Sequence, residues 1–336
     1  MEFLSEYGLF LAKAVTVLVV FALIVAIAAS ASQKDKGSAP KIVHLNKKLK
    51  SLTDHIDSKT LSKKELKAKA KKEKVESKNK DEADKPRTYV LDFNGDIKAS
   101  QADKLKDDIT AILALDEAIE EVVVKVESGG GMVHQYGFAA AQLDRIKQRN
   151  IPLTVCVDRV AASGGYMMAV VADKIVSAPF AIIGSIGVIA QLPNFNKVLK
   201  KNDIDFEVHT AGEYKRTLTM FGENTDKARD KFRDDLKDVH TMFKDFVKGH
   251  RDVVNVETVA NGDVWYGEKA KEQNLVDVLQ TSDDYLLEKT KTSDVYLITH
   301  EKKKNLAQKL GLSARKGVSE GIEAAVEKLM HSKWYF

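Results

Sequence analysis

Ser163 stands where an acyl-transfer enzyme would place its nucleophile. It precedes Gly164 and Gly165, and it separates an apolar run at 152–157, which predicts a buried strand, from a small-residue segment that predicts a buried helix. Glycine tolerates such a tight turn and lets a substrate approach the backbone. A helix N-terminus also points unpaired N–H groups at this spot. A serine beside glycines is more often a turn or a helix cap. The motif therefore indicates catalysis only if the rest of the chain supplies a base and an oxyanion hole.

A second glycine-rich turn, Ser128-Gly129-Gly130-Gly131, follows an apolar strand predicted at 121–126. The carboxyl ends of parallel strands meet at one edge of a sheet, so we expect this turn and Ser163 to share a crevice. Backbone N–H groups there can form an oxyanion hole. The alternative interpretation is a plain loop. No Gly-Lys-Ser/Thr follows, and neither turn fits the dinucleotide fingerprint, which excludes the common phosphate-binding loops.

A serine hydroxyl also needs a base within hydrogen-bond reach. Of the eight histidines, only His134 and His209 fall in the predicted core and outside a long helix predicted at 227–251. The lysine candidate is Lys215, in a loop after a strand predicted at 206–209. An exposed lysine is only about 0.1% neutral near pH 7.5, so this role requires burial, which lowers the pKa of a lysine. The alternative for Lys215 is a solvated surface residue.

Short strands and helices alternate along the middle of the chain. We predict strands at 89–93, 121–126, 152–157 and 174–176, and helices at 102–115 and 136–148. This alternation predicts an α/β fold with a mainly parallel sheet that is covered on both faces. A short helix is expected at 195–201. The long helix at 227–251 has an apolar stripe made of Phe232, Leu236, Val239, Met242, Phe243 and Phe246.

The N-terminal segment predicts a membrane anchor. Residues 14–31 are uncharged and mostly apolar, and with the residues before Lys13 they are long enough to cross a bilayer. A cleaved signal peptide is the rival, since 29–31 resembles a cleavage site, but Glu2 and Glu6 precede the first lysine. We therefore assign 1–31 to an N-terminal transmembrane anchor. The lysines that follow it place the body of the protein in the cytoplasm by the positive-inside rule.

The segments that flank the core are charged. Residues 32–87 form a Lys-rich linker, helical or disordered, which can also hold anionic headgroups at a membrane surface. Because 33–87 contains no aromatic residue, nucleic-acid binding is not expected. Residues 297–336 are a basic segment and an amphipathic helix, which packs on protein or lies on the membrane.

The overall composition excludes two further classes of site. The net charge of +4 is mild. The one cysteine, Cys156, offers neither a disulfide framework nor metal-ligand spacing, and we expect it to pack in the core.

Three motifs, taken in order, resemble the serine–lysine peptidases of the signal peptide peptidase A family. They are the segment around Ser163, the segment Ile183-Gly-Ser185-Ile-Gly-Val188, and Gly212-Glu-Tyr-Lys215. The resemblance covers 89–286, and the anchor, the Lys-rich spacer and 173–179 are similar to the short inner-membrane members of that family. The segment 265–277 resembles the end of the crotonase-like fold. The resemblance thus implies a crotonase/Clp-like fold, with a peptidase domain at 88–296.

The resemblance also implies roles for five residues. Ser163 is the nucleophile, Lys215 the general base, and Gly130 and Gly164 provide the N–H groups of the oxyanion hole. Ser185 positions the lysine amine. No metal or cofactor is implied. Where the family has Ser-Pro-Gly-Gly, this chain has Ser-Gly-Gly-Gly from position 128, so the loss of proline leaves this turn less fixed.

The predicted function is that of a membrane-anchored serine endopeptidase. It would cleave peptides, or unfolded or membrane-derived polypeptides, through an acyl-enzyme, as a single-pass protein of the bacterial inner membrane and a homo-oligomer. The resemblance implies a periplasmic catalytic domain, whereas the lysines after the span favour the cytoplasm. The alternatives are a crotonase-like acyl-CoA enzyme, which needs no serine, and an inactive scaffold that regulates membrane proteolysis.

Overall fold

The computed structural model describes residues 40–79 and 85–300, and also residues 7, 8, 10, 11, 13, 15, 16 and 18. The chain divides into two compact units, and the unit formed by 42–299 carries the sheet. The predicted anchor at 1–31 lies largely outside the described residues, and the C-terminal helix within 297–336 does so almost entirely. None of the described helices combines the length and apolar character that crossing a bilayer requires.

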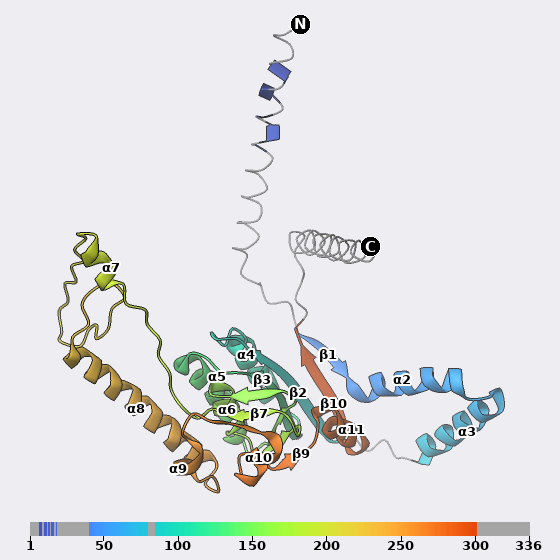
Figure 1. Cartoon of the computed structure of the whole chain (residues 1–336). Helices are drawn as coiled ribbons and strands as arrows, with labels where there is room; N and C mark the ends of the chain where they lie inside the picture. Colours follow the sequence, from blue (N-terminus) through green and yellow to red (C-terminus); the bar gives the residue numbers. More distant parts are fainter. Residues whose placement is uncertain are drawn as a thin grey trace, which may run out of the picture. The chain divides into compact units, whose positions relative to one another are not determined.

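A ten-stranded sheet organises the described part of the chain (Figure 1). Its main path runs β1-β10-β2-β3-β4-β6-β9, and from β10 to β9 each neighbouring pair is parallel. The strands are β1 (Lys41–His44), β2 (Arg87–Gly95), β3 (Ile119–Ser128), β4 (Leu153–Val157), β5 (Val160–Ala162), β6 (Lys174–Ser177), β7 (Ile182–Gly184), β8 (Val264–Tyr266), β9 (Val278–Leu279) and β10 (Asp294–Thr299). The prediction of an α/β fold with a mainly parallel sheet is confirmed.

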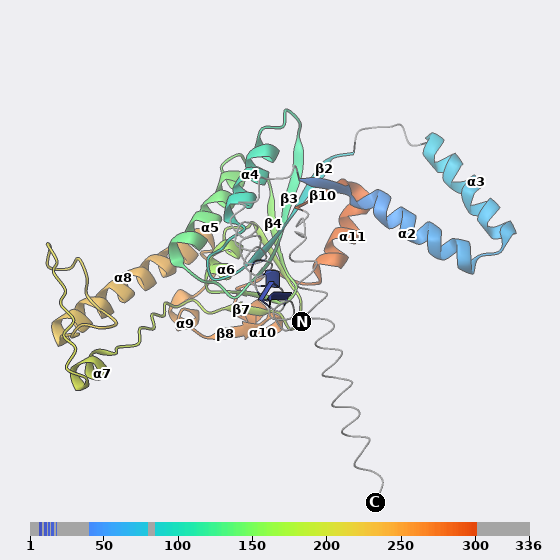
Figure 2. The same ribbon diagram turned by 90° about the horizontal axis from the view of Figure 1, so that it is seen from above.

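Helices cover both faces of this sheet because successive strand residues point to opposite sides. Leu91 and Val124 belong to one core with α4 (Ala102–Leu113), α5 (Val133–Lys147) and α6 (Gly164–Ala169). Val90 and Val123 belong to a second core with α11 (Ser282–Thr292). Figure 2 shows α4 and α5 on one side of the strands and α11 on the other. The remaining helices are α2 (Leu45–Thr60), α3 (Lys63–Asn79), α7 (Asn196–Lys201), α8 (Asp226–His250), α9 (Val256–Val259) and α10 (Gly267–Glu272).

The sheet branches at the carboxyl end of β3, and this branch positions the residues of the site. β4 pairs with β3 up to Lys125, whereas β5 pairs with β3 only at Ser128. β5 then pairs in parallel with β7, and β7 pairs antiparallel with β8. The chain therefore delivers the residue after β5 beside the turn that ends β3.

One sequence prediction between β7 and α9 is wrong, and a second is confirmed only in part. The segment predicted as a strand at 206–209 is not a strand, because Phe206 and Val208 are exposed and have no neighbouring strand to pair with. In α8 the apolar stripe is buried only near the C-terminal end: Phe243 and Val247 are buried, but Met242 is 69% exposed. The first half of α8 instead leaves the sheet and carries α7 and the loops around it at its far end (Figure 1).

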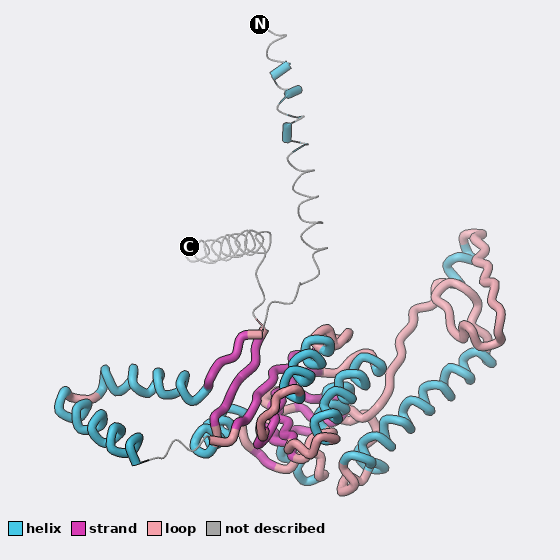
Figure 3. The backbone as a smooth tube through the Cα atoms, turned by 180° about the vertical axis from the view of Figure 1, so that it is seen from behind, coloured by secondary structure: helices cyan, strands magenta, loops and turns pink. Residues whose placement is uncertain are grey.

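Residues 45–79 form a helical hairpin that is joined to the domain at its start (Figure 3). Asn46 Nδ2 donates to the carbonyl oxygens of Thr290 and Ser293 at 2.9 Å each. The Val295 N–H donates to Asn46 Oδ1, also at 2.9 Å. One asparagine at the first turn of α2 thus fixes the hairpin to the end of α11 and to β10.

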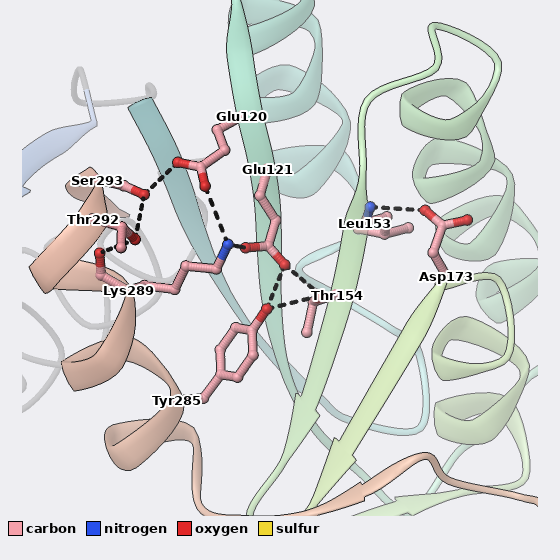
Figure 4. A network of polar contacts seen from close by, with 9 residues as sticks. All are labelled: Glu120, Glu121, Leu153, Thr154, Asp173, Tyr285, Lys289, Thr292 and Ser293. Atoms are coloured by element: carbon pink, nitrogen blue, oxygen red, sulfur yellow. Dashed lines mark hydrogen bonds and ion pairs between the residues drawn. The ribbon is translucent and has the colours of Figure 1, made fainter. Parts of the chain in front are cut away.

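A buried ion pair holds α11 against the sheet at the end opposite the glycine turns (Figure 4). Glu121 on β3 is buried, and its Oε2 lies 2.6 Å from Lys289 Nζ. Its Oε1 accepts hydrogen bonds from Thr154 and Tyr285, at 2.5 and 2.6 Å. Burial raises the pKa of the Tyr285 hydroxyl, and its bond to Glu121 acts in the same direction. Removing one charge would strand the other in a site of low polarity.

Lys289→Met is therefore expected to destabilise the domain by about 3 kcal/mol, because it leaves the Glu121 carboxylate buried without its cation. Urea denaturation followed by circular dichroism measures the change. The control is Lys200→Met, which removes the exposed ion pair with Glu223 and should leave the midpoint unchanged. Equal midpoints for the two variants would contradict a stabilising role for this pair.

Candidate active site

Ser163 adopts a backbone conformation that few residues other than glycine adopt. It lies between β5 and α6 with φ 51° and ψ −119°. Its N–H donates to the Gly184 carbonyl at 2.7 Å, and its carbonyl accepts the Met167 N–H at 2.9 Å. A positive φ at a residue with a side chain is strained and survives only where the surroundings enforce it. The pairing of β5 with β7 and the first turn of α6 enforce it here.

The two glycine turns lie against each other, as the sequence predicted. A Cβ built on Gly130 would stand 2.7 Å from the Gly164 nitrogen and 2.7 Å from Ser163 Cβ. Gly130 has φ +89°, so a side chain there would be excluded both by space and by conformation. The sheet branch therefore brings Ser163, Gly164 and Gly130 together. Gly164 is the first residue of α6, and no described residue accepts its N–H.

A buried relay of hydroxyl groups holds the Gly130 turn. The Gly130 N–H donates to Ser128 Oγ at 3.0 Å, and Ser128 Oγ lies 2.5 Å from the Tyr136 hydroxyl. Tyr136 in turn donates to the Asp96 carbonyl at 2.7 Å. Burial raises the pKa of Tyr136, so the phenol keeps its proton and its place in the relay. The turn is thus fixed by side-chain hydroxyl groups.

Tyr136 is the residue of the site that the sequence did not reveal. Its ring lies against Gly164, where an added Cβ would come 2.3 Å from the ring carbon Cγ. It thereby touches one glycine of the proposed oxyanion hole and holds the other through Ser128. In the sequence it is one more apolar-like position of α5, and nothing in its spacing marks it as polar and buried.

Ser185 occupies the matching position on the neighbouring strand. Ala162 of β5 pairs with Gly184 of β7. Ser163 and Ser185 are the next residues on the two strands, so they lie at matching positions. Ser185 also has a positive φ, 52°, and its N–H donates to the Asp263 carbonyl at 2.7 Å. The structure thus sets Ser185 beside the nucleophile candidate.

A small apolar hollow opens next to Ser163. Its walls come from the Gly130 turn, α5, α6, the segment after β7 and the C-terminal half of α8, namely Gly131, Val133, Ser163, Gly164, Met167, Gly187, Val188, Val239 and Phe243. The hollow has no charged wall residue among those described. Gly131, the last residue of the glycine turn predicted at 128–131, lies in this wall.

Lys215 does not reach Ser163 within one chain. It is exposed and lies in the loop before α8, next to Tyr214, whose ring is 5.6 Å from Lys231 Nζ. Lys231 is on the second turn of α8, whereas Phe243 on the same helix lines the hollow beside Ser163. The twelve residues from Lys231 to Phe243 span about 18 Å, more than the length of a lysine side chain.

Neither candidate histidine makes a hydrogen bond to Ser163 among the described residues. His209 is 88% exposed at its side chain and pairs with Glu207 at 3.2 Å. His134 is exposed on the first turn of α5. Cys156 is buried in the core, as predicted, and burial raises the pKa of its thiol, which excludes it as a competing nucleophile. Ser163 is therefore the nucleophile candidate that the fold singles out.

Comparisons with known proteins identify the family. Residues 145–296 match the profile of peptidase family S49, and residues 2–143 match the profile of the N-terminal part of the same family. A probable protease SohB of Haemophilus influenzae is 44% identical over 334 residues, which is 93% of each chain. A probable protease SohB of Buchnera aphidicola from Acyrthosiphon pisum is 50% identical over 238 residues, 71% of each chain.

The chain belongs to peptidase family S49. The predicted resemblance to the signal peptide peptidases and to their short member SohB is confirmed, and so is the prediction of a serine-type endopeptidase. The solved structure of a 1510-N membrane-bound stomatin-specific protease aligns with 67% of this chain and 96% of its own, at 17% identity and a TM-score of 0.42. That likeness is too remote to carry an argument.

Gly130→Ala should abolish peptide hydrolysis, because the new methyl group would push against Ser163 and the Gly164 N–H. We expect a fall in kcat of at least about 100-fold, the loss typical of one oxyanion donor. The matched control is Gly137→Ala on α5, where an added Cβ meets no atom within 4 Å. It should keep full activity and gain stability. Comparable activity of the two variants would refute the proposed place of Gly130 in the site.

Proposed function

We propose that this chain is a membrane-anchored serine endopeptidase that uses Ser163 as nucleophile and Lys215 as general base. The observation that carries the proposal is the strained Ser163 backbone, held directly against Gly130 and Gly164. A fold that strains the backbone at Ser163, and puts an unpaired helix N-terminus and a glycine turn around it, is arranged for acyl transfer. The sheet branch also supports the crotonase/Clp-like assignment of the fold.

The chemistry follows from these groups. Neutral Lys215 Nζ takes the proton from Ser163 Oγ, which attacks the carbonyl carbon of the scissile peptide bond. The oxyanion accepts hydrogen bonds from the N–H groups of Gly164 and Gly130. The Gly130 N–H exchanges its bond to Ser128 Oγ for one to the oxyanion, because a charged acceptor binds more strongly than a neutral hydroxyl. Each donor contributes about 3 kcal/mol.

The second half of the reaction restores the enzyme. As the C–N bond breaks, the Lys215 ammonium returns the proton to the leaving amine, and Ser163 remains as an ester. Neutral Lys215 then takes a proton from water, which attacks the ester carbonyl. The acid product leaves, and Ser163 Oγ regains its proton from Lys215.

The base is supplied by a second copy of the chain. Lys215 lies at the far end of α8 from the hollow beside Ser163, so one copy cannot assemble the dyad without moving that whole region. The segment between β7 and α8 exposes many apolar side chains, which is typical of a surface that other protein covers: Ile189, Leu192, Phe195, Val198, Ile204, Phe206 and Phe221. Covering it would also remove the Lys215 amine from water.

The substrate class follows from the hollow and the anchor. The surface beside Ser163 is apolar, and the span proposed at 14–31 keeps the site close to a bilayer. Both features favour unfolded or membrane-derived polypeptides. By resemblance the peptidase domain, 88–296, lies on the periplasmic side of the inner membrane, with 32–87 as its linker.

The second candidate function is an inactive scaffold that regulates membrane proteolysis, and the separation of Lys215 from Ser163 favours it. A mixing experiment decides between the two. Ser163→Ala and Lys215→Ala should each be inactive alone. Co-expressed in equal amounts, they should regain about a quarter of wild-type peptide hydrolysis, the share of sites that combine an intact serine with a neighbour's intact lysine.

Three results would overturn parts of this account. Two inactive variants that stay inactive when mixed would place the dyad within one chain. Full activity of Lys215→Ala alone would remove the lysine from the mechanism. An inactive wild-type protein would favour the scaffold. The control is Lys201→Ala, an exposed lysine on α7, which should remain active by itself.

A further inference from the structure

The outer side of α3 is a strip of lysines that the proposed chemistry does not use. The helix sequence, KKELKAKAKKEKVESKN, holds eight lysines against three glutamates. At 3.6 residues per turn, Lys63, Lys64, Lys67 and Lys71 fall within an arc of roughly 100°. All four are exposed, and no acidic residue of α3 falls on the same arc. We call these four residues the lysine strip.

The acidic residues of α3 that the structure describes are used inside the hairpin. Glu73 pairs with Lys50 on α2 at 2.8 Å, and Lys69 pairs with Asp57. Glu65 accepts the Ser62 N–H at 2.8 Å, while Ser62 Oγ accepts the Glu65 N–H, which is a capping box at the start of α3. The hairpin thus directs its acidic groups inward and leaves the lysine strip without counterions.

This segregation lowers the stability of the free helix. Lys63 and Lys67, and Lys67 and Lys71, stand four residues apart, where like charges repel. A helix that only needs to stay solvated would alternate the signs of its charges along this face. The four side chains make no hydrogen bond or ion pair with any described residue. An anionic surface would remove the repulsion.

We propose that the lysine strip binds the anionic headgroups of a lipid bilayer. This inference rests on the membrane anchor of the proposed function. If the span ends at Ala31, the ten residues to Lys41 reach at most about 35 Å, so the hairpin stays near the headgroups. Lying flat, the 17 residues of α3 cover about 25 Å of surface. Anionic lipid is favoured over nucleic acid because 33–87 has no aromatic side chain to stack on bases.

The test uses the full-length chain, with a polarity-sensitive dye on Ala68→Cys of α3. The native Cys156 is buried and should not react. The protein is reconstituted in vesicles of phosphatidylcholine, alone or mixed with phosphatidylglycerol. We expect the dye emission to shift to the blue only with phosphatidylglycerol, and high salt to reverse the shift. Replacing the lysine strip by glutamine should lower the ratio of bound to free hairpin on the order of 1,000-fold.

A charge-matched control separates the lysine strip from net charge. Lys197, Lys201, Lys271 and Lys291 are also exposed, and changing all four to glutamine lowers the charge equally. This variant should keep the shift. The proposal is overturned if both lipids give the same emission or if the control variant loses the shift as well. It is also overturned if duplex DNA shifts the emission and phosphatidylglycerol vesicles do not. Flotation with neutral vesicles measures the anchor separately, and peptide hydrolysis in detergent measures the chemistry separately.

Discussion

The hydrogen bond from the Ser163 N–H to the Gly184 carbonyl is the contact on which the site depends. It holds a serine in a left-handed conformation between β5 and α6. That conformation is available only because β5 leaves the main sheet at Ser128 and pairs with β7. The branch therefore does two things at once: it strains Ser163 and lays it against the turn at Gly130.

The turn at 128–131 contains no proline and is held by hydroxyl groups instead. Proline would fix one backbone dihedral of the turn. Here the Gly130 N–H, Ser128 and Tyr136 form a chain of hydrogen bonds that ends on the Asp96 carbonyl. A turn held by a side-chain hydroxyl can release its N–H to a stronger acceptor, so it can be rigid in the free enzyme and still serve an oxyanion.

The sequence predicted the parts of the fold whose contacts lie within the sheet. β2, β3, β4 and β6 were found because buried strands need continuous apolar runs, and Ser163 because a serine before two glycines marks a strand-to-helix turn. Tyr136 was missed because a buried tyrosine cannot be told from an apolar core residue by spacing. The predicted strand at 206–209 failed because its apolar residues are exposed and no described strand pairs with it.

The position of Lys215 could not be predicted either. Its place in the sequence, 52 residues after Ser163, says how far apart the two lie along the chain but not which copy of the chain provides the partner. In the proposed mechanism the length of α8 favours a second copy, because the hollow beside Ser163 meets one half of the helix and Lys215 lies near its beginning. A catalytic residue that acts in a neighbouring copy makes its functional contacts outside its own chain, where the sequence of one chain cannot show them.

Covalent labelling of Ser163 tests the central claim most directly. The reagent is a fluorophosphonate, which reacts only with a serine that is both activated and next to an oxyanion hole. Mass spectrometry of the digested protein should find one adduct, on the peptide that contains Ser163, and none in Ser163→Ala. An enzyme that hydrolyses peptides yet carries no adduct, or carries it on a different serine, would contradict the account.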